Sequence, residues 1–212
     1  MTENYQTKHF TLKNLKDTEN HHSWIKDVIR NKSIITNAWE SYNELTTFFN
    51  KYSVFLEVRK EFSVYGTKLS SSKSLDEIKI HHKLIIEIIN NRNIIEDAWN
   101  DYESLRDFFS RNTLFKEINN ELSKYKKYFS ESSLDEIKNH HEWIKSVLND
   151  RRQYENILKD LHDLMKFLSD KVFKGLESEL IKHKNIISEA KNVNEMKNSH
   201  LWINSIKSIK GQ

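Results

Sequence analysis

A short motif that occurs four times constrains the fold of this chain more than any other feature. Its clearest copy, residues 134–145, reads LDEIKNHHEWIK. The four copies begin 60, 59 and 59 residues apart, at Leu15, Leu75, Leu134 and Val193. A repeat of this length is the signature of an array of similar structural units, so it predicts an architecture before it predicts any function.

Each copy of the motif has the apolar spacing of a core-facing helix. When its first residue is position 0, positions 0, 3, 7, 10 and 14 lie on one side at about 100° per residue, and we call this side the main stripe. In the third copy the main stripe is Leu134, Ile137, His141, Ile144 and Leu148. The main stripe predicts a core position for the histidine at position 7 of every copy. These histidines are His22, His82, His141 and His200.

A second face of the same helix also repeats, at positions 2, 6 and 9, about 110° away from the main stripe. It carries an acid, usually a histidine and usually a tryptophan, followed by a β-branched residue at position 13. The residues at the first three positions are Asp17, His21 and Trp24, then Glu77 and His81, then Glu136, His140 and Trp143, and finally Glu195 and Trp202. Because a helix with a single neighbour needs one patterned face, we expect this helix to be the central helix of its repeat.

The second face is the candidate binding site of the chain, with two interpretations. Either it packs against the next helix, with the acid accepting a hydrogen bond from its histidine, or it is exposed as a repeated ligand site. The start of the helix suggests another use for the acids. Ser74 with Glu77, and Ser133 with Glu136, have the spacing of capping boxes, while Asn14 and Asn192 can cap the other two copies.

The composition predicts an all-α fold. The chain contains no proline and only three glycines, whereas an all-β chain needs many turn-forming residues. We expect tandem helical repeats of about 59–60 residues, with three helices each and a C-terminal capping helix. The predicted segments are an N-terminal arm at 1–13, repeats at 14–73, 74–132 and 133–191, and a truncated fourth repeat at 192–212 that caps the array.

Two local features refine this arrangement. Asn31, Asn91 and Asp150 occupy position 16 of successive repeats, where the chain could either continue as one long helix or start a new one. We predict a break, because an asparagine or aspartate is a good N-cap and a helix of about 36 residues is rare. The segment from Gly66 to Ser72 is predicted to be the loosest linker in the chain.

The repeated histidines allow three kinds of chemistry. The first is structural, with the main-stripe histidines bonded to neighbouring helices. The second is a histidine and carboxylate metal site in a helical bundle, for which His22, His82, His141 and His200 are the candidate ligands. The third is an acid–base or catalytic role, but no nucleophile recurs beside the histidines, and no catalytic residue is predicted.

The balance of charge and apolar sequence limits the partners. With 34 basic and 31 acidic residues, the chain lacks a concentrated basic excess; Lys32, Arg92 and Arg151 are the basic candidates for nucleic acid because they recur. No cysteine is present, no apolar run approaches a membrane span of about 20 residues, and no signal peptide is recognisable. We therefore expect a cytoplasmic, non-enzymatic interaction or scaffold protein without a cofactor, which binds a protein partner. The alternatives are the metal-binding bundle and an RNA or ribonucleoprotein accessory factor.

Overall fold

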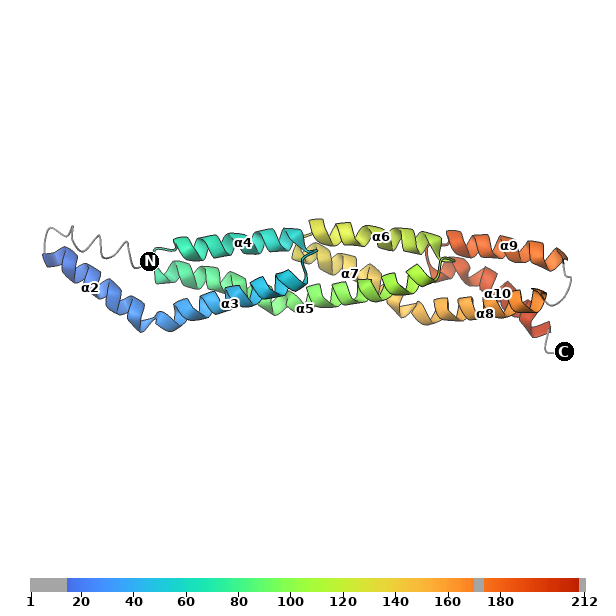
Figure 1. Ribbon diagram of the computed structural model, residues 1–212, viewed down its shortest axis with the longest axis horizontal. Helices are drawn as coiled ribbons and strands as arrows, with labels where there is room; N and C mark the ends of the chain where they lie inside the picture. Colours follow the sequence, from blue (N-terminus) through green and yellow to red (C-terminus); the bar gives the residue numbers. More distant parts are fainter. Residues whose placement is uncertain (1–14, 170–173, 210–212) are drawn as a thin grey trace. The chain divides into compact units, whose positions relative to one another are not determined.

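The computed structural model describes residues 15–169 and 174–209. These residues form nine helices and no strand, which confirms the all-α prediction (Figure 1). The predicted N-terminal arm, residues 1–13, lies outside the described part of the chain. The helices are α2 (Leu15–Arg30), α3 (Lys32–Lys51), α4 (Leu56–Ser71), α5 (Leu75–Arg111), α6 (Lys116–Glu131), α7 (Leu134–Asn149), α8 (Arg151–Ser169), α9 (Lys174–Glu189) and α10 (Val193–Ile209).

The apolar stripes of the sequence become the buried sides of these helices. In α8 the buried residues are Tyr154, Ile157, Leu161, Leu164 and Leu168. Their 3-4 spacing places about one apolar side chain per turn on the same side of the helix. Leu158, the neighbour of Ile157 in the sequence, is half-buried.

The capping boxes predicted from the sequence set the starts of α5 and α7. At α7 the side chain of Ser133 accepts a hydrogen bond from the backbone N–H of Glu136, whose carboxylate accepts one from the Ser133 N–H at 2.8 Å. At α5 the Glu77 N–H donates to Ser74 at 3.2 Å, but the Glu77 carboxylate accepts from the N–H of Lys73 at 2.7 Å. The box at α5 is thus shifted by one residue on its return bond.

The predicted break at position 16 is present at two of the three junctions. The helix is interrupted at Asn31 and at Asp150, but α5 runs through Asn91 as one helix of 37 residues, so the prediction is wrong there. The main stripe stays in phase across the junction, which lets a helix continue without turning its apolar side away. The asparagine side chains do not distinguish the cases. Asn31 donates to the carbonyl of Asp27 at 2.8 Å, and Asn91 makes the same bond to Glu87 at 2.7 Å.

The predicted loose linker at residues 66–72 is wrong, since α4 continues to Ser71 and Gly66 is a buried helical residue. A Cβ atom at Gly66 would overlap the ring of Tyr42 on α3. That ring is held in place, because it stacks on Phe62 of α4 with 4.6 Å between centroids. The glycine therefore serves a close approach of two helices, and a composition-based reading of glycine as a linker residue fails here.

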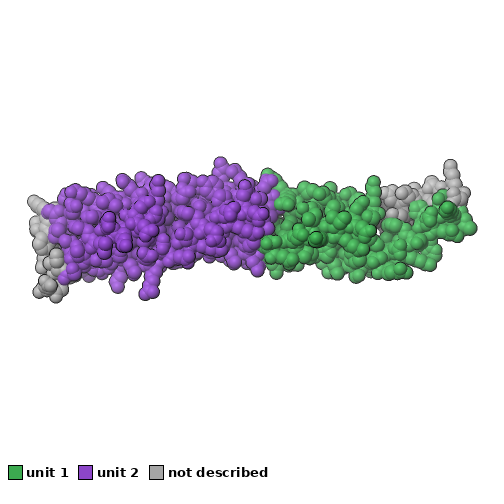
Figure 2. Space-filling model, turned by 180° about the vertical axis from the view of Figure 1, so that it is seen from behind, with its two compact units in different colours: residues 1–51, 59–92 green, residues 52–58, 93–212 purple. Residues whose placement is uncertain are grey.

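The chain divides into two compact units, which Figure 2 colours separately. Unit 1 comprises residues 1–51 and 59–92, and unit 2 comprises residues 52–58 and 93–212. The first half of α5 belongs to unit 1 and its second half to unit 2. In unit 1, α3, α4 and the first half of α5 pack together as the α3–α4–α5 bundle, with a core that includes Leu45 and Ile85.

Unit 2 contains two groups of three helices. The second half of α5 packs with α6 and α7, and α8 packs with α9 and α10; we call these the α5–α6–α7 bundle and the α8–α9–α10 bundle. Tyr154 of α8 connects them. Its ring contacts Phe109 and Phe115 with centroid separations of 5.5 and 5.1 Å, and all three side chains are buried. The aromatic core of unit 2 is therefore continuous from one bundle to the next.

We expect Gly66→Ala to destabilise the protein by about 1–3 kcal/mol, because the added methyl group overpacks against the held ring of Tyr42. Gly175 in the first turn of α9 is the matched control, since nothing lies within 4 Å of a Cβ added there. Gly175→Ala should stabilise by about 0.5–1 kcal/mol through helix propensity. Chemical denaturation measures both changes, and equal shifts for the two variants would contradict the close approach.

Helix α10 packs on α8 and α9, so deletion of residues 192–212 should expose their apolar sides and lower the melting temperature, with aggregation visible by light scattering. A finer comparison uses two residues of α10. Ile203 is fully buried, whereas Leu201 is 57% exposed. Ile203→Ala should cost about 2–5 kcal/mol and Leu201→Ala much less. An unchanged melting curve after the deletion would show that α10 does not cover α8 and α9.

Candidate functional site

Three main-stripe histidines make the same kind of contact between helices. His141 of α7 lies 2.7 Å from a carboxylate oxygen of Asp101 on α5, and His200 of α10 lies 2.7 Å from Asp160 on α8. In unit 1, His82 of α5 lies 3.0 Å from the hydroxyl oxygen of Ser41 on α3. In each bundle the histidine of the third helix thus reaches the first helix. His141 is buried and His82 and His200 are half-buried, and each contact gives a partner to a ring nitrogen that is partly removed from solvent.

The partners of these histidines were missed by the sequence analysis. Ser41, Asp101 and Asp160 occur 60 and 59 residues apart, which is the interval of the motif itself. A comparison of all positions across the copies, polar as well as apolar, would have found them. The search for motifs considered only the motif helix and the apolar stripes of the other segments.

The fourth main-stripe histidine is different. His22 on α2 is exposed, so the prediction of a core position is wrong for this copy. The physical reason is that α2 buries none of its residues, so its main stripe is less covered than the main stripes of the other three copies.

The α8–α9–α10 bundle extends its histidine contact into a charged network. The ammonium group of Lys207 donates to Asp160 at 2.6 Å and to Asp163 at 2.9 Å. Burial by itself would raise the pKa of Asp160, but hydrogen bonds from Lys207 and His200 outweigh it and lower that pKa below its ordinary value. The hydrogen bond from Lys207 likewise lowers the pKa of Asp163. The network therefore holds both carboxylates in their charged form at the contact of α8 with α10.

Three second-face acids, Glu77, Glu136 and Glu195, cap helix starts, so the expected acid–histidine hydrogen bond is wrong for the Glu77–His81 and Glu136–His140 pairs. The carboxylate of Glu195 accepts from the N–H of Lys191 at 2.8 Å, in the same way as Glu77 and Glu136 at their own helix starts. The backbone and side chain of Ser133 both donate to Glu136 and lower its pKa. These exposed acids are occupied at helix N-termini, where a negative charge is favourable.

The aromatic side chains of the second face stack on the second helix of their bundle. Trp143 lies parallel to Tyr125 of α6 at 4.6 Å, and His140 lies parallel to Tyr128 at 5.0 Å. In the last bundle, Trp202 takes the same role against His183 of α9, with 4.3 Å between ring centroids. None of the second-face tryptophans is exposed, and all are half-buried.

The remaining second-face residues all lie in unit 1. In unit 1, Trp24 lines a small pocket of about 30 Å³ with Val28 and Ile78, while Asp17 and His21 are half-buried. The Nδ1 atom of His81 is buried and has no hydrogen-bond partner. The structure thus distributes the candidate residues along helix contacts and does not gather them into one surface.

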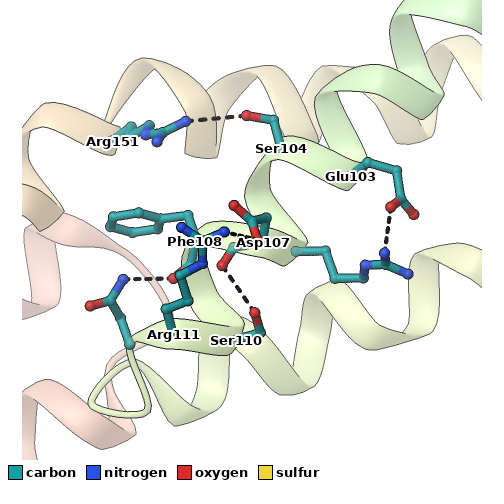
Figure 3. A network of polar contacts seen from close by, with 9 residues as sticks. Glu103, Ser104, Asp107, Phe108, Ser110, Arg111 and Arg151 are labelled. Carbon is teal, nitrogen blue, oxygen red and sulfur yellow. Dashed lines mark hydrogen bonds and ion pairs between the residues drawn. The ribbon is translucent and has the colours of Figure 1, made fainter.

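Two of the three basic candidates are engaged between helices, whereas Lys32 is exposed. Arg92 forms an ion pair with Glu44 on α3. Arg151 of α8 donates to Ser104 on α5 at 3.1 Å, as Figure 3 shows, and its guanidinium lies over the ring of Phe108. Glu44 and Ser104 are 60 residues apart, so this contact also recurs at the interval of the motif.

An open groove in unit 2 was not identified as a candidate by the sequence analysis. It has a volume of about 410 Å³ and lies between α8 and α9, where His162 and Lys184 stand beside Met165. Helix α8 contributes apolar residues and His162, α9 contributes polar residues, and Thr113 and Leu114 precede α6. No regular spacing in the sequence could have marked this groove, because it depends on how α8 and α9 approach each other.

Neither a metal cluster nor a membrane span is found in the part of the chain that the structure describes. No group of three histidine, aspartate or glutamate side chains there could hold a metal ion. None of the described helices combines the length and apolar character that a membrane span requires. Comparison with known proteins adds no family, since no family model, curated protein or solved structure matches the chain.

We expect Trp143→Ala to lower the free energy of unfolding by about 3 kcal/mol, near the lower end of the range for tryptophan truncation because the side chain is half-buried. The loss comes from the stacked ring of Tyr125, whose pKa burial raises to about 12. Trp143→Phe should retain most of the stability, since a smaller ring can still stack. A normal melting curve for Trp143→Ala would identify the side chain as part of a binding surface.

The Lys207 network predicts an acid-dependent stability. Because the folded pKa of Asp160 and Asp163 is lowered from 3.8, their contribution is fully present above pH 3.8 and is lost as the pH falls below it. Lys207→Met removes that contribution. The melting temperatures of this variant and of the wild type should therefore differ above pH 3.8 and converge below it. A constant difference down to pH 2 would show that Lys207 acts through packing alone.

Proposed function

We propose that this chain is a non-enzymatic protein of tandem helical repeats, which serves as a scaffold and binds a protein partner. The observation that carries the proposal is the use of the repeated polar and aromatic side chains between helices. The main-stripe contact of His141 with Asp101 has its counterpart in His200 with Asp160. Side chains committed in this way hold helices together, and they are not arranged around a substrate.

The same contacts support the repeat. Histidine contacts recur in all three bundles, and the arginine contacts of Arg92 and Arg151 recur in two. In this proposal each structural repeat consists of two helices followed by a motif helix. The repeats predicted from the sequence begin at the motif helix instead. Helix α10 then completes the last bundle on α8 and α9, and this is how it closes the array.

A scaffold role is supported by the surfaces that remain. Arrays of helical repeats present extended outer faces, and partner binding is their usual function. Large apolar side chains are exposed on several helices, including Ile29 on α2, Ile80 on α5 and Ile181 on α9. The balanced charge and the engagement of Arg92 and Arg151 favour a protein partner over nucleic acid.

Affinity capture of the tagged full-length chain tests this proposal. Capture is performed in parallel with nuclease, with a chelator and without either, and the purified chain is analysed for metal content. We expect a stoichiometric protein partner that survives both treatments. Loss of all partners after nuclease, with a steep decrease in binding as salt rises, would favour the RNA function. A stoichiometric transition metal in the purified chain would favour the metal-binding bundle.

A further inference from the structure

Helix α2 carries the repeated motif, but its main stripe is exposed. Leu15 at position 0 is 75% exposed and Ile29 at position 14 is 69% exposed, while His22 at position 7 is also exposed. These residues have the apolar spacing of the motif helices that build the cores. An exposed apolar side of this regularity marks a surface that binds another molecule.

The other three copies show what covers such a stripe. At position 10, Ile85, Ile144 and Ile203 are all 0% exposed, whereas Ile25 is half-buried. At position 3 the contrast is larger. Ile78, Ile137 and Met196 are 6%, 0% and 0% exposed, whereas Thr18 is exposed. In each of the three copies the covering elements are the two helices that come before the motif helix.

The described helices α3 and α5 of unit 1 lie on the other face of α2 and leave its main stripe exposed at both ends. Trp24 and Val28, at positions 9 and 13, line the small pocket together with Ile35 of α3 and Ile78 of α5. These positions lie about 110° from the main stripe around the helix. Among the described helices of unit 1, the main stripe of α2 is consequently not used for packing as it is in the other three copies.

The internal copies also define the chemistry of the missing surface. In every bundle the histidine at position 7 contacts an oxygen of the first helix. For His141 and His200 that oxygen belongs to a carboxylate. The first and second helices of each bundle form an antiparallel pair, as α5 and α6 do in Figure 1. A molecule that fits α2 therefore offers two antiparallel amphipathic helices and a carboxylate opposite His22.

We propose that α2 is the third helix of a further three-helix bundle, whose other two helices are an antiparallel pair supplied by a separate polypeptide that presents a carboxylate to His22. This inference rests on the proposed function, because it names the class of protein partner and the surface that binds it. The partner resembles the α5–α6 pair in chemistry and presents its inner face.

A peptide with the sequence of residues 93–133, which contains the α5–α6 pair and Asp101, is a defined probe of this surface. The chain has no cysteine, so Thr18→Cys places a single thiol on the main stripe of α2 in the otherwise complete protein. We expect an excess of the peptide to slow alkylation of this thiol by about tenfold. Only the undocked protein reacts, and a modest docking free energy leaves about a tenth of the protein undocked. The thiol of Ile80→Cys, at an exposed position of α5, is the matched control and should react at an unchanged rate.

A double-mutant cycle tests the polar contact. His22→Ala in the full-length chain and Asp101→Ala in the peptide should each weaken the protection of the Thr18→Cys thiol. If the two groups meet, the combined loss will be smaller than the product of the separate losses, because each change already removes the same contact. Independent losses would mean that the carboxylate does not face His22.

A fusion keeps the test decisive if the free peptide does not fold. Residues 93–133 replace residues 1–14 directly before Leu15, which reproduces the order in which α5 and α6 precede α7. Protection of the Thr18→Cys thiol in this fusion supports the docking surface, and absence of protection in both formats overturns it. Self-association of the wild-type chain that Ile29→Glu abolishes would identify a second copy as the occupant and would also overturn the proposal.

Failure of this surface and failure of the scaffold function give different results. If capture yields a nuclease-resistant partner whose binding is unaffected by Ile29→Glu, the scaffold function stands and the α2 surface is wrong. If the thiol is protected but capture yields RNA or no partner, the surface accepts a helical pair and the proposed function is wrong.

Discussion

The motif helices α5, α7 and α10 each pack two faces at once, and the arrangement of the bundles depends on this requirement. The main stripe and the second face lie about 110° apart, so each face meets a different neighbouring helix. In the α5–α6–α7 bundle, His141 of α7 bonds Asp101 of α5, and Trp143 stacks on Tyr125 of α6. The polar contact also sets the register between the helices, because a ring nitrogen must meet one oxygen at hydrogen-bond distance, whereas apolar contacts tolerate a shift.

The three histidine contacts are built on one plan but differ in strength and surroundings. His82 meets the hydroxyl of Ser41, a neutral partner, whereas His141 and His200 meet carboxylates, and hydrogen bonds to charged groups are the stronger kind. In the last bundle Lys207 occupies position 14, where other copies carry an apolar residue, and it bonds the same Asp160 that receives His200. The α8–α10 contact thus combines an apolar core with a charged edge. The charged edge makes the stability of this contact depend on acid pH.

The proposed function rests on a comparison of two groups of side chains: those that form contacts inside the bundles and those that stay exposed. The histidines, tryptophans and arginines that looked like candidate ligands are mostly engaged between helices, and the second-face acids cap helix starts. The main stripe of α2 stays exposed at Leu15 and Ile29, whereas the main stripes of the other three motif helices are covered by neighbouring helices. A scaffold that binds a helical pair is consistent with this distribution, because the exposed surface has the same pattern as surfaces that already bind helices.

Periodicity was enough to predict the helices, the all-α class and the capping box at Ser133, since these depend on residues within one or two turns of each other. It was also enough to mark the motif helix as two-sided. It could not show that α5 continues through Asn91, that Gly66 admits the ring of Tyr42, or that His140 stacks on Tyr128. Those outcomes depend on which helices become neighbours. The exposure of His22 belongs to the same class, because an identical local pattern is buried or exposed according to the surface that lies opposite it.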